Sequence, residues 1–422
     1  MNSISEMTIT DPAIARDPYE YYEHLRSEDP VHYDEKLGAW LVTRYNDIVA
    51  VARDTELFSD EMRVSDAIRS PYQDEANDYI RSKGYYLLDP SDSFKVDGEL
   101  HKRRRKLVAH AFTAHAVAAM ADRVAELCRQ QLDTFSEGGE VDLLRQYATP
   151  VPLNVICDAL GLPLDRTEDV SRAAYSMVAR AGTGATREEA FQHADNIMKL
   201  QEFAREAIEV RRKEPRSDLI SQVVHSGADQ PAEEQLTEQE LISIVSVSIA
   251  GGVDTTRNSI AYALYTLATR PELLKRLQES ENQDKDIAAL CEETMRFYSA
   301  VPALPRVTTR DTELGGKAIP KNSLVFLCWA SGNRDPERFE DPDVFNIDRP
   351  ASAQHLGFGT GVHICLGAML ARNEMKAAIK QFVNAVESVE LAVAEDDLDY
   401  SESIVILRGL KSLPVRLKMK AH

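Results

Sequence analysis

The stretch that decides the fold runs from His355 to Gly367 and reads HLGFGTGVHICLG, and the helical pattern AMLARNEMKAAIKQF follows it directly. Glycines at positions 357, 359 and 361 allow the backbone to turn tightly and to approach another group closely. Cys365 falls at or just before the first turn of the following helix, where the helix dipole and the free amide groups favour a thiolate. The segment therefore predicts a reactive or ligating cysteine on a glycine-rich loop.

A thiolate on such a loop can be a nucleophile, a zinc ligand or an axial haem ligand. A dinucleotide-binding loop would open with G-x-G-x-x-G after a strand, and Phe358 and a cysteine interrupt that pattern. A zinc site needs about four ligands, whereas His363 and Cys365 supply one pair and the sequence has no second close Cys pair. A Cys–His hydrolase stays open on sequence alone. The other cysteines, Cys128, Cys157, Cys291 and Cys328, are expected to be buried structural residues.

Charge and composition exclude several classes of protein. The 422 residues include 49 Lys and Arg against 69 Asp and Glu, a formal net charge of −20, which disfavours generic nucleic-acid binding. No apolar run approaches the ~18 residues that a membrane helix needs, and the N-terminal residues lack the apolar core of a secretory signal. The scattered cysteines predict a reducing, cytoplasmic setting. The lack of a long linker predicts a single domain over residues 1–422.

Helical periodicity dominates the chain, and strand-like segments are short. Thr237 to Glu240 predicts a capping box at the start of the longest helix, whose uncharged middle should cross the protein interior. The expected helices cover 99–124, 196–212, 238–269, 284–298 and 367–386, and the expected strands cover 40–43, 324–329, 404–407 and 415–417. We expect a mainly α fold with a smaller β part (α+β).

The run Phe358-Gly359-x-Gly361-x-His363-x-Cys365-x-Gly367 resembles the haem-binding signature of the cytochromes P-450. The resemblance implies that Cys365 is the thiolate ligand of haem b (iron protoporphyrin IX), with Phe358, Gly359, His363 and Gly367 around it. It also implies the cytochrome P-450 fold, with the haem between the long helix and the Cys-bearing loop. A thiolate ligand pushes electron density towards O–O cleavage, so an O2-dependent monooxygenase is expected.

Glu293 and Arg296 resemble the structural E-x-x-R pair of this family, and Arg349 in the string FNIDR resembles its third member. Without that context, a Glu/Arg pair at i, i+3 is more often a surface ion pair. The string PERF at 336–339 looks similar but lies one segment too early. The resemblance therefore implies a buried network on the haem side of the core.

Gly251 and Gly252 lie inside the long helix, where each costs about 1 kcal/mol relative to alanine. Close helix packing, with threonines bonded back to the helix backbone, is one explanation. Beside the haem signature, the segment resembles the oxygen-binding groove of the family. That implies that Ala250 and Gly251 face the haem, with both glycines leaving room for O2. It also implies that Asp254 and Thr255 are the acid–alcohol pair that delivers protons.

His101 and Arg105 share one helix face and match the family's H-x-x-x-R, which binds haem propionates. Arg306 and His363 match two further propionate contacts, and cationic donors suit carboxylates. Read alone, the run of Lys and Arg is typical of a solvated face or a nucleic-acid patch.

Lys102, Arg103 and Lys106 on the same helix are expected to face solvent and to form a docking patch for an acidic redox partner. The chain has no room for a flavin or iron–sulfur domain. The resemblance implies electrons from a ferredoxin and an NAD(P)H-dependent ferredoxin reductase. The protein is expected to be a monomer that binds neither nucleic acid nor membrane.

Val247, Ala250, Val301 and Ile404 match pocket positions of the family and are all apolar. They favour hydroxylation or oxidative demethylation of a terpenoid, a steroid, a fatty acid or an aromatic compound. The TTRN run at 255–258 resembles bacterial members that act on steroids and terpenes. Residues 59–98 depart from the family pattern, and that region caps the substrate pocket in the family.

Overall fold

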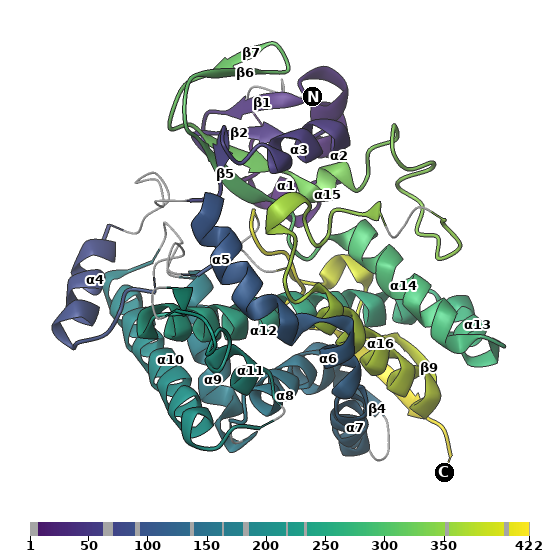
Figure 1. Cartoon of the computed structure of the whole chain (residues 1–422). Coiled ribbons are helices and arrows are strands. Elements are labelled where there is room, and N and C mark those ends of the chain that lie inside the picture. Colours follow the sequence, from purple (N-terminus) through teal and green to yellow (C-terminus); the bar gives the residue numbers. More distant parts are fainter. Residues whose placement is uncertain are drawn as a thin grey trace. The chain divides into compact units, whose positions relative to one another are not determined.

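The computed structural model describes residues 7–61, 71–88, 93–135, 139–162, 164–179, 185–216, 218–231, 234–350, 354–400 and 405–421. Helices dominate within these residues and strands are short (Figure 1), as a mainly α fold with a smaller β part requires. The chain forms two compact units. The first comprises Met1–Phe58, Ala119–Pro152 and Thr255–His422, and the second comprises Ser59–Ala118 and Leu153–Asp254.

The second unit is built from helices in its described part. They are α4 (Gln73–Ser82), α5 (Gly98–Ala109), most of α6 (Ala114–Ala119), most of α8 (Pro150–Ala159), α9 (Thr167–Ala179), α10 (Arg187–Lys213), α11 (Leu219–Val224) and the first half of α12 (Glu238–Thr269). The long helix α10 begins with a capping box between Thr186 and Glu189. It packs against α9, α4 and α11.

The first unit combines helices with the sheets of the described chain, except that Ser59 at the end of β3 belongs to the second unit. Its helices are α1 (Pro12–Arg16), α2 (Tyr19–Glu28), α3 (Tyr45–Arg53), α7 (Ala121–Leu132), the second half of α12, α13 (Pro271–Glu279), α14 (Gln283–Tyr298), α15 (Trp329–Gly332) and α16 (Ala368–Ala385). Helix α16 packs against both α7 and α14. This packing brings the residues that follow Cys365 next to the helix that carries Glu293.

A mixed sheet in the first unit has the strand order β1-β2-β8-β5-β3. These strands are β1 (Val31–Asp34), β2 (Ala39–Val42), β8 (Leu324–Leu327), β5 (Leu304–Thr308) and β3 (Phe58–Ser59). A second sheet has the order β4-β10-β9, with β4 (Gly139–Asp142), β10 (Pro414–Met419) and β9 (Val386–Leu391), and β6 (Thr312–Leu314) pairs with β7 (Lys317–Ile319). Leu327 and Trp329 belong to an apolar core with Ile48 and Val51 of α3 and Leu356 of the cysteine loop.

Helix α12 has the bounds that the sequence predicts. Buried side chains occur along its length, including Ile242, Ile249, Ile260 and Leu264 at 0% exposure. At its start the amide of Thr237 donates to Glu240 Oε2 at 2.8 Å, and the amide of Glu240 donates to Thr237 Oγ1 at 3.2 Å. The capping box is therefore confirmed, and it satisfies two amides that the helix leaves without intrahelical partners.

Four of the predicted elements differ in the structure. The helix predicted over 196–212 begins earlier, because α10 spans Arg187–Lys213. The predicted helix over 99–124 is broken, because Thr113 is extended and its hydroxyl accepts from the amide of Ala116 at 3.3 Å, which starts a new helix. Strand β8 ends at Leu327, and α15 begins at Trp329. Ile404 lies outside the described residues, and 405–407 form no strand.

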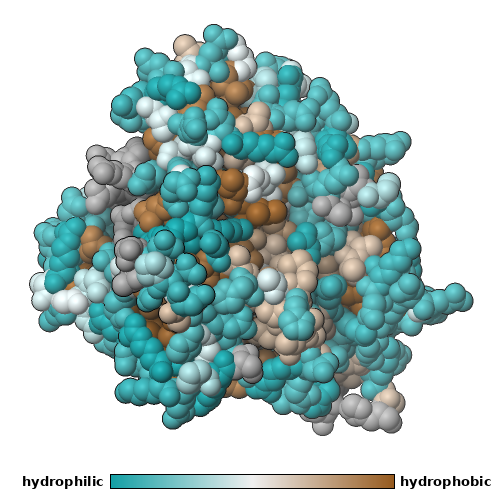
Figure 2. All heavy atoms as spheres, in the orientation of Figure 1, coloured by the Kyte–Doolittle hydropathy of each residue, from teal (hydrophilic) through white to brown (hydrophobic). Residues whose placement is uncertain are grey.

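No helix in the described part of the chain combines the length and apolar character needed to span a membrane. Figure 2 shows hydrophilic side chains over most of the visible face, with apolar atoms in smaller patches between them.

The capping box generates a test of α12. Replacing Thr237 by alanine removes the hydroxyl that accepts from Glu240, and we expect it to lower the free energy of unfolding by about 1 kcal/mol. Denaturant unfolding of the full chain measures this change. Thr237→Ser keeps the hydroxyl and should stay close to the parent protein. Equal losses in both variants would show that the cap does not contribute.

Candidate active site

The cysteine loop connects the apolar core to α16 and folds back on itself. The amide of Cys365 donates to the carbonyl of Phe358 at 2.9 Å. Gly359 and Gly361 have φ angles of 68° and 76°, which other residues rarely adopt. A Cβ on Gly361 would also lie 2.8 Å from the carbonyl oxygen of Ala52 in α3. The glycines thus allow both the sharp turn and the close approach to α3.

Cys365 differs from the other cysteines in its exposure. Cys128, Cys157, Cys291 and Cys328 are buried, as predicted, whereas Cys365 is exposed. Burial raises the pKa of Cys128, Cys157 and Cys291 to about 12, so these three remain thiols. Cys365 lies two residues before the N-cap position of α16, Gly367. Cys328 also lies at a helix N-terminus, as the N-cap of α15, but it is buried, so Cys365 is the exposed cysteine at such a position, where a thiolate is favoured.

The two pairs of predicted propionate contacts lie in different units. His101 is 3% exposed and Arg105 is half-buried, both on α5 of the second unit. Arg306 is 2% exposed on β5, and its Nη1 donates to the carbonyl of Pro305 at 2.8 Å. His363 is half-buried in the helical turn Gly361–His363 of the cysteine loop. Arg306 and His363 therefore belong to the unit that holds Cys365.

The predicted docking patch on α5 needs correction. Lys102 is exposed and pairs with Glu99 at 2.7 Å. Arg103 does not face solvent freely, because it pairs with Glu240 and donates to the carbonyl of Gln235 at 2.9 Å. The helix turns Arg103 towards the start of α12, where the carboxylate of Glu240 compensates its charge. Lys106 is exposed, as predicted.

The glycine pair in α12 leaves open space at one position only. Gly251 is exposed and a Cβ built on it meets nothing within 4 Å, whereas a Cβ on Gly252 would touch Ile156 at 3.8 Å. Ala250 and Asp254 beside them are 6% and 4% exposed. Among the described residues, Gly251 thus has open space beside it and Gly252 packs against α8, and the role of both glycines in leaving room for O2 stays a prediction.

The relay and pocket residues are placed as follows. Thr255 is half-buried, and its carbonyl accepts from the hydroxyl of Ser259 at 2.8 Å. Val247 is half-buried on α12. Val301 packs against the apolar core that contains Leu327 and Trp329. Ile404, the remaining pocket prediction, is outside the described residues.

Glu293, Arg296 and Arg349 come together in the first unit. Arg296 donates from Nη2 to Glu293 Oε1 at 2.7 Å and from Nε to Oε2 at 2.8 Å, and both side chains are 0% exposed. Arg349 Nε lies 3.4 Å from Glu293 Oε1. Arg296 also binds the carbonyls of Asn333 and Pro342, each at 2.8 Å. The pair is thus a buried anchor rather than a surface contact, and from the PERF string it is the Phe339 ring that contacts it, 5.4 Å from the guanidinium of Arg296.

Sequence reasoning missed two further sets of charged residues. Arg104 is 5% exposed and donates to Glu240 at 2.8 Å and to the carbonyl of Ser93 at 2.8 Å. Glu292, His355 and Arg372 form a second network beside the cysteine loop. The doubled acid at 292–293 was a visible signal in the sequence. Its partners could not be found by spacing because they lie on other elements.

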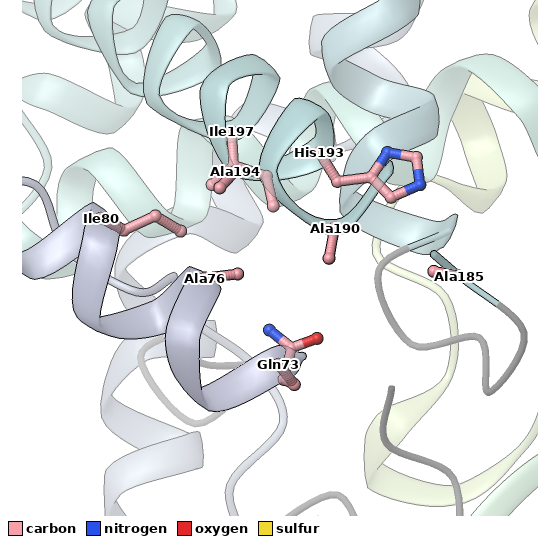
Figure 3. A pocket seen from close by; sticks show the side chains of 8 residues that line it. All are labelled: Gln73, Ala76, Ile80, Ala185, Ala190, His193, Ala194 and Ile197. Carbon is pink, nitrogen blue, oxygen red and sulfur yellow. The ribbon is translucent and has the colours of Figure 1, made fainter. Parts of the chain in front are cut away.

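Part of the idiosyncratic region 59–98 packs against α10 in the second unit. Tyr79 of α4 donates to Asp195 at 2.9 Å, and Arg187 donates to Glu75 at 2.8 Å. Figure 3 shows Ala76 and Ile80 of α4 opposite α10 across a cavity. Its volume of about 10 Å³ holds no more than about one water molecule, so it is too small for a substrate.

The residues around Cys365 fit a large planar haem. Apolar side chains near Cys365 in the chain are exposed: Val362 and Ile364 of the loop at 53% and 45%, and Met369 in the first turn of α16 at 43%. An apolar ring system would remove such surface from water. The buried cation Arg306 lies in the same unit and suits a propionate carboxylate. In the described residues, no group of three or more His, Cys, Asp or Glu side chains is arranged to hold a bare metal ion.

Comparisons with known proteins agree with this chemistry. The model of the cytochrome P-450 family matches residues 65–407. Cytochrome P-450 109 of Bacillus spizizenii is 33% identical over 408 residues, which cover 96% of this chain and 92% of the relative. Vitamin D(3) 25-hydroxylase of Pseudonocardia autotrophica is 33% identical over 410 residues, covering 95% and 94%. A solved cytochrome P-450 structure from Chondromyces apiculatus has a TM-score of 0.84 at 30% identity, covering 99% of this chain and 100% of the other.

The buried pair gives a stability prediction. Glu293→Gln leaves the guanidinium of Arg296 without its buried counter-charge, and we expect a loss of about 3–5 kcal/mol in unfolding free energy. Denaturant unfolding and the yield of folded protein measure the effect. Arg276→Gln is the control, because the Arg276–Asp348 pair is exposed at 41% and 65%. An exposed pair contributes about 0–1 kcal/mol, so similar losses in both variants would contradict the anchoring role.

Proposed function

The chain belongs to the cytochrome P-450 family, and from that premise we propose how its own residues serve the reaction. It is an oxidoreductase that binds haem b and inserts one oxygen atom of O2 into a small-molecule substrate. Redox partners supply the electrons. The haem provides the site of O2 activation when bound.

Cys365 is proposed to be the thiolate ligand. The observation that carries this proposal is that Cys365 is exposed just before the N-terminus of α16. Two apolar side chains of the same loop, Val362 and Ile364, are also exposed. Phe358 supports the position of Cys365, because its carbonyl accepts the amide proton of Cys365 at 2.9 Å. Gly359 and Gly367 are proposed to help hold the haem, because neither carries a side chain that would occupy space beside Cys365.

The haem propionates are proposed to be held by His101, Arg105, Arg306 and His363. Support comes from their chemistry, since cationic donors form strong hydrogen bonds to carboxylates. Glu293, Arg296 and Arg349 are proposed as structural residues that fix the segment before the cysteine loop.

Asp254 and Thr255 are proposed to handle the protons that O2 cleavage consumes. In this role the carboxyl of Asp254 takes a proton from solvent and passes it towards the hydroxyl of Thr255. The open space at Gly251, next to Ala250, gives a small ligand room beside α12.

The substrate is proposed to be apolar, with Val247, Val301 and Ile404 lining its pocket. A terpenoid, steroid, fatty acid or aromatic compound suits such side chains, because burial of apolar surface drives binding. The similarity to a vitamin D(3) 25-hydroxylase favours a steroid-like skeleton among these. Hydroxylation or oxidative demethylation is the expected reaction.

A ferredoxin and an NAD(P)H-dependent ferredoxin reductase are proposed as the electron donors, acting on a cytoplasmic monomer. The exposed Lys102 and Lys106 offer positive charge to an acidic partner on a chain of net charge −20. We further propose that residues 1–422 act as one domain, since α12 contributes residues to both units.

The ligand proposal has a direct spectroscopic test. Cys365→Ser should abolish the strongly red-shifted Soret band of the dithionite-reduced carbon monoxide complex, because that band requires a thiolate ligand. Cys291→Ala serves as the control, since Cys291 is 2% exposed and should not contact the haem. A red-shifted band that survives in Cys365→Ser would refute the assignment.

The proton relay predicts a change in coupling rather than in folding. Thr255→Ala, reconstituted with ferredoxin and reductase, should consume NAD(P)H but release much of the reducing power as hydrogen peroxide. Thr269→Ala is the matched control, because the hydroxyl of Thr269 donates to the carbonyl of Tyr265 on the same helix at 2.9 Å. Peroxide yields that match the parent enzyme would argue against a role for the Thr255 hydroxyl.

A further inference from the structure

The carboxylate of Glu292 is the centre of a network that reaches the cysteine loop. Arg372 of α16 donates to it from Nε at 2.6 Å and from Nη2 at 2.9 Å. His355, at the start of the loop, lies with Nε2 at 3.2 Å from Glu292 Oε2. One side chain of α14 therefore binds both the loop and the helix that follows it.

The second nitrogen of His355 defines the state of this ring. The amide of Gly357 donates to His355 Nδ1 at 2.9 Å, and the side chain is 1% exposed. Since Nδ1 accepts a hydrogen bond, Nε2 carries the proton and donates it to Glu292. The His355 ring thus joins the turn at Gly357 to the carboxylate of Glu292.

Arg372 extends the network to the residue that supports Cys365. Its guanidinium lies over the Phe358 ring, 4.3 Å from the ring centroid. The His355 ring is 5.8 Å from the same ring. The carbonyl of Phe358 then accepts the amide proton of Cys365. Two contacts therefore separate Arg372 from Cys365.

The charge on Glu292 is firmly held. Burial raises the pKa of this carboxyl, but hydrogen bonds from His355 and Arg372 outweigh burial and hold the pKa at about 2. The carboxylate stays ionised at neutral pH and offsets the charge of Arg372. Without the Glu292 carboxylate, the guanidinium of Arg372 over the Phe358 ring would lack this counter-charge.

We propose that Glu292, His355 and Arg372 form a loop clamp that positions Phe358 and, through it, the Cys365 thiolate. The three are positioning residues. The inference rests on the proposal that Cys365 is the haem ligand. We infer that this network controls two properties of the site. One is how long the Cys365 thiolate stays bound to the haem iron, and the other is how strongly the positive charge of Arg372 acts on it.

The two properties respond differently to two variants. Glu292→Gln removes the negative charge and disrupts the hydrogen bonds that Arg372 and His355 donate to this side chain. Arg372→Lys keeps the positive charge but loses the two parallel hydrogen bonds and the flat contact with Phe358. Asp284→Asn is the matched control, because Asp284 pairs with Lys380 at 2.6 Å across the same two helices. That pair is exposed and lies away from the loop.

The experiment uses the haem-loaded full chain and two readouts besides activity. One is the rate at which the reduced carbon monoxide complex loses its red-shifted band. The other is the reduction potential of the haem iron from a spectroelectrochemical titration. Ile379→Val in the core of α16, where Ile379 is 0% exposed, supplies a variant that is destabilised without touching the clamp.

We expect Glu292→Gln and Arg372→Lys to lose the red-shifted band at least about tenfold faster than the parent, because a hydrogen bond to a charged group contributes enough free energy for such a factor. Glu292→Gln should also shift the potential to more positive values, since the uncompensated Arg372 favours the reduced iron. Arg372→Lys should shift it less. Asp284→Asn and Ile379→Val should stay within about twofold in rate.

The clamp would be overturned if Glu292→Gln lost the red-shifted band no faster than Asp284→Asn. It would also be overturned if Ile379→Val lost the band as fast as Glu292→Gln. Cys365→Ser run in parallel separates the two proposals. If Cys365→Ser keeps the red-shifted band, the ligand assignment fails and the clamp falls with it. If Cys365→Ser loses the band and Glu292→Gln changes neither readout, only the clamp is wrong.

Discussion

The structure of the first unit depends on the compensation of charges buried on α14. Glu293 and Arg296 are both inaccessible to solvent, so neither charge could remain there without the other. Arg296 donates hydrogen bonds to backbone carbonyls of the segment that follows α15, and Glu293 accepts a hydrogen bond from the amide of Asn346 at 2.9 Å. That segment has little regular structure of its own. The charged pair replaces the hydrogen-bond ladder that a strand or helix would provide.

The same helix fixes the cysteine loop with its other acid. Glu292 binds His355 at the start of the loop and Arg372 after its end, while the loop's glycines bring the backbone against α3. The loop therefore has anchors at both ends and a close backbone contact in the middle. This arrangement leaves Cys365 exposed yet held, which suits a ligand whose partner must enter from outside the chain. The four buried cysteines have no such access.

Features set by local spacing were predicted from the sequence, whereas distant pairing was predicted only where the family resemblance implied it, as for Arg349 and Glu293. The bounds of α12, its capping box and the glycine loop depend on residues a few positions apart. The break at Thr113 went unpredicted because helical periodicity continues across it. A hydrogen bond from the amide of Ala116 to the Thr113 hydroxyl starts the new helix there. Arg103 was assigned to solvent because Glu240 lies 137 positions away in the chain. His355 and Arg372 were missed as partners of Glu292 for the same reason, at 63 and 80 positions.

Adjacent carboxylates at 292 and 293 explain why both networks belong to one helix. Successive residues on a helix point about 100° apart, so neighbouring acids can serve two separate sets of donors. Glu293 holds the segment that leads to the loop, and Glu292 holds the loop and α16. A buried ion pair is weak evidence for stability, and the value of these pairs lies in fixed geometry. A single rigid helix that orients both segments leaves the side chain of Cys365 few ways to move relative to the core.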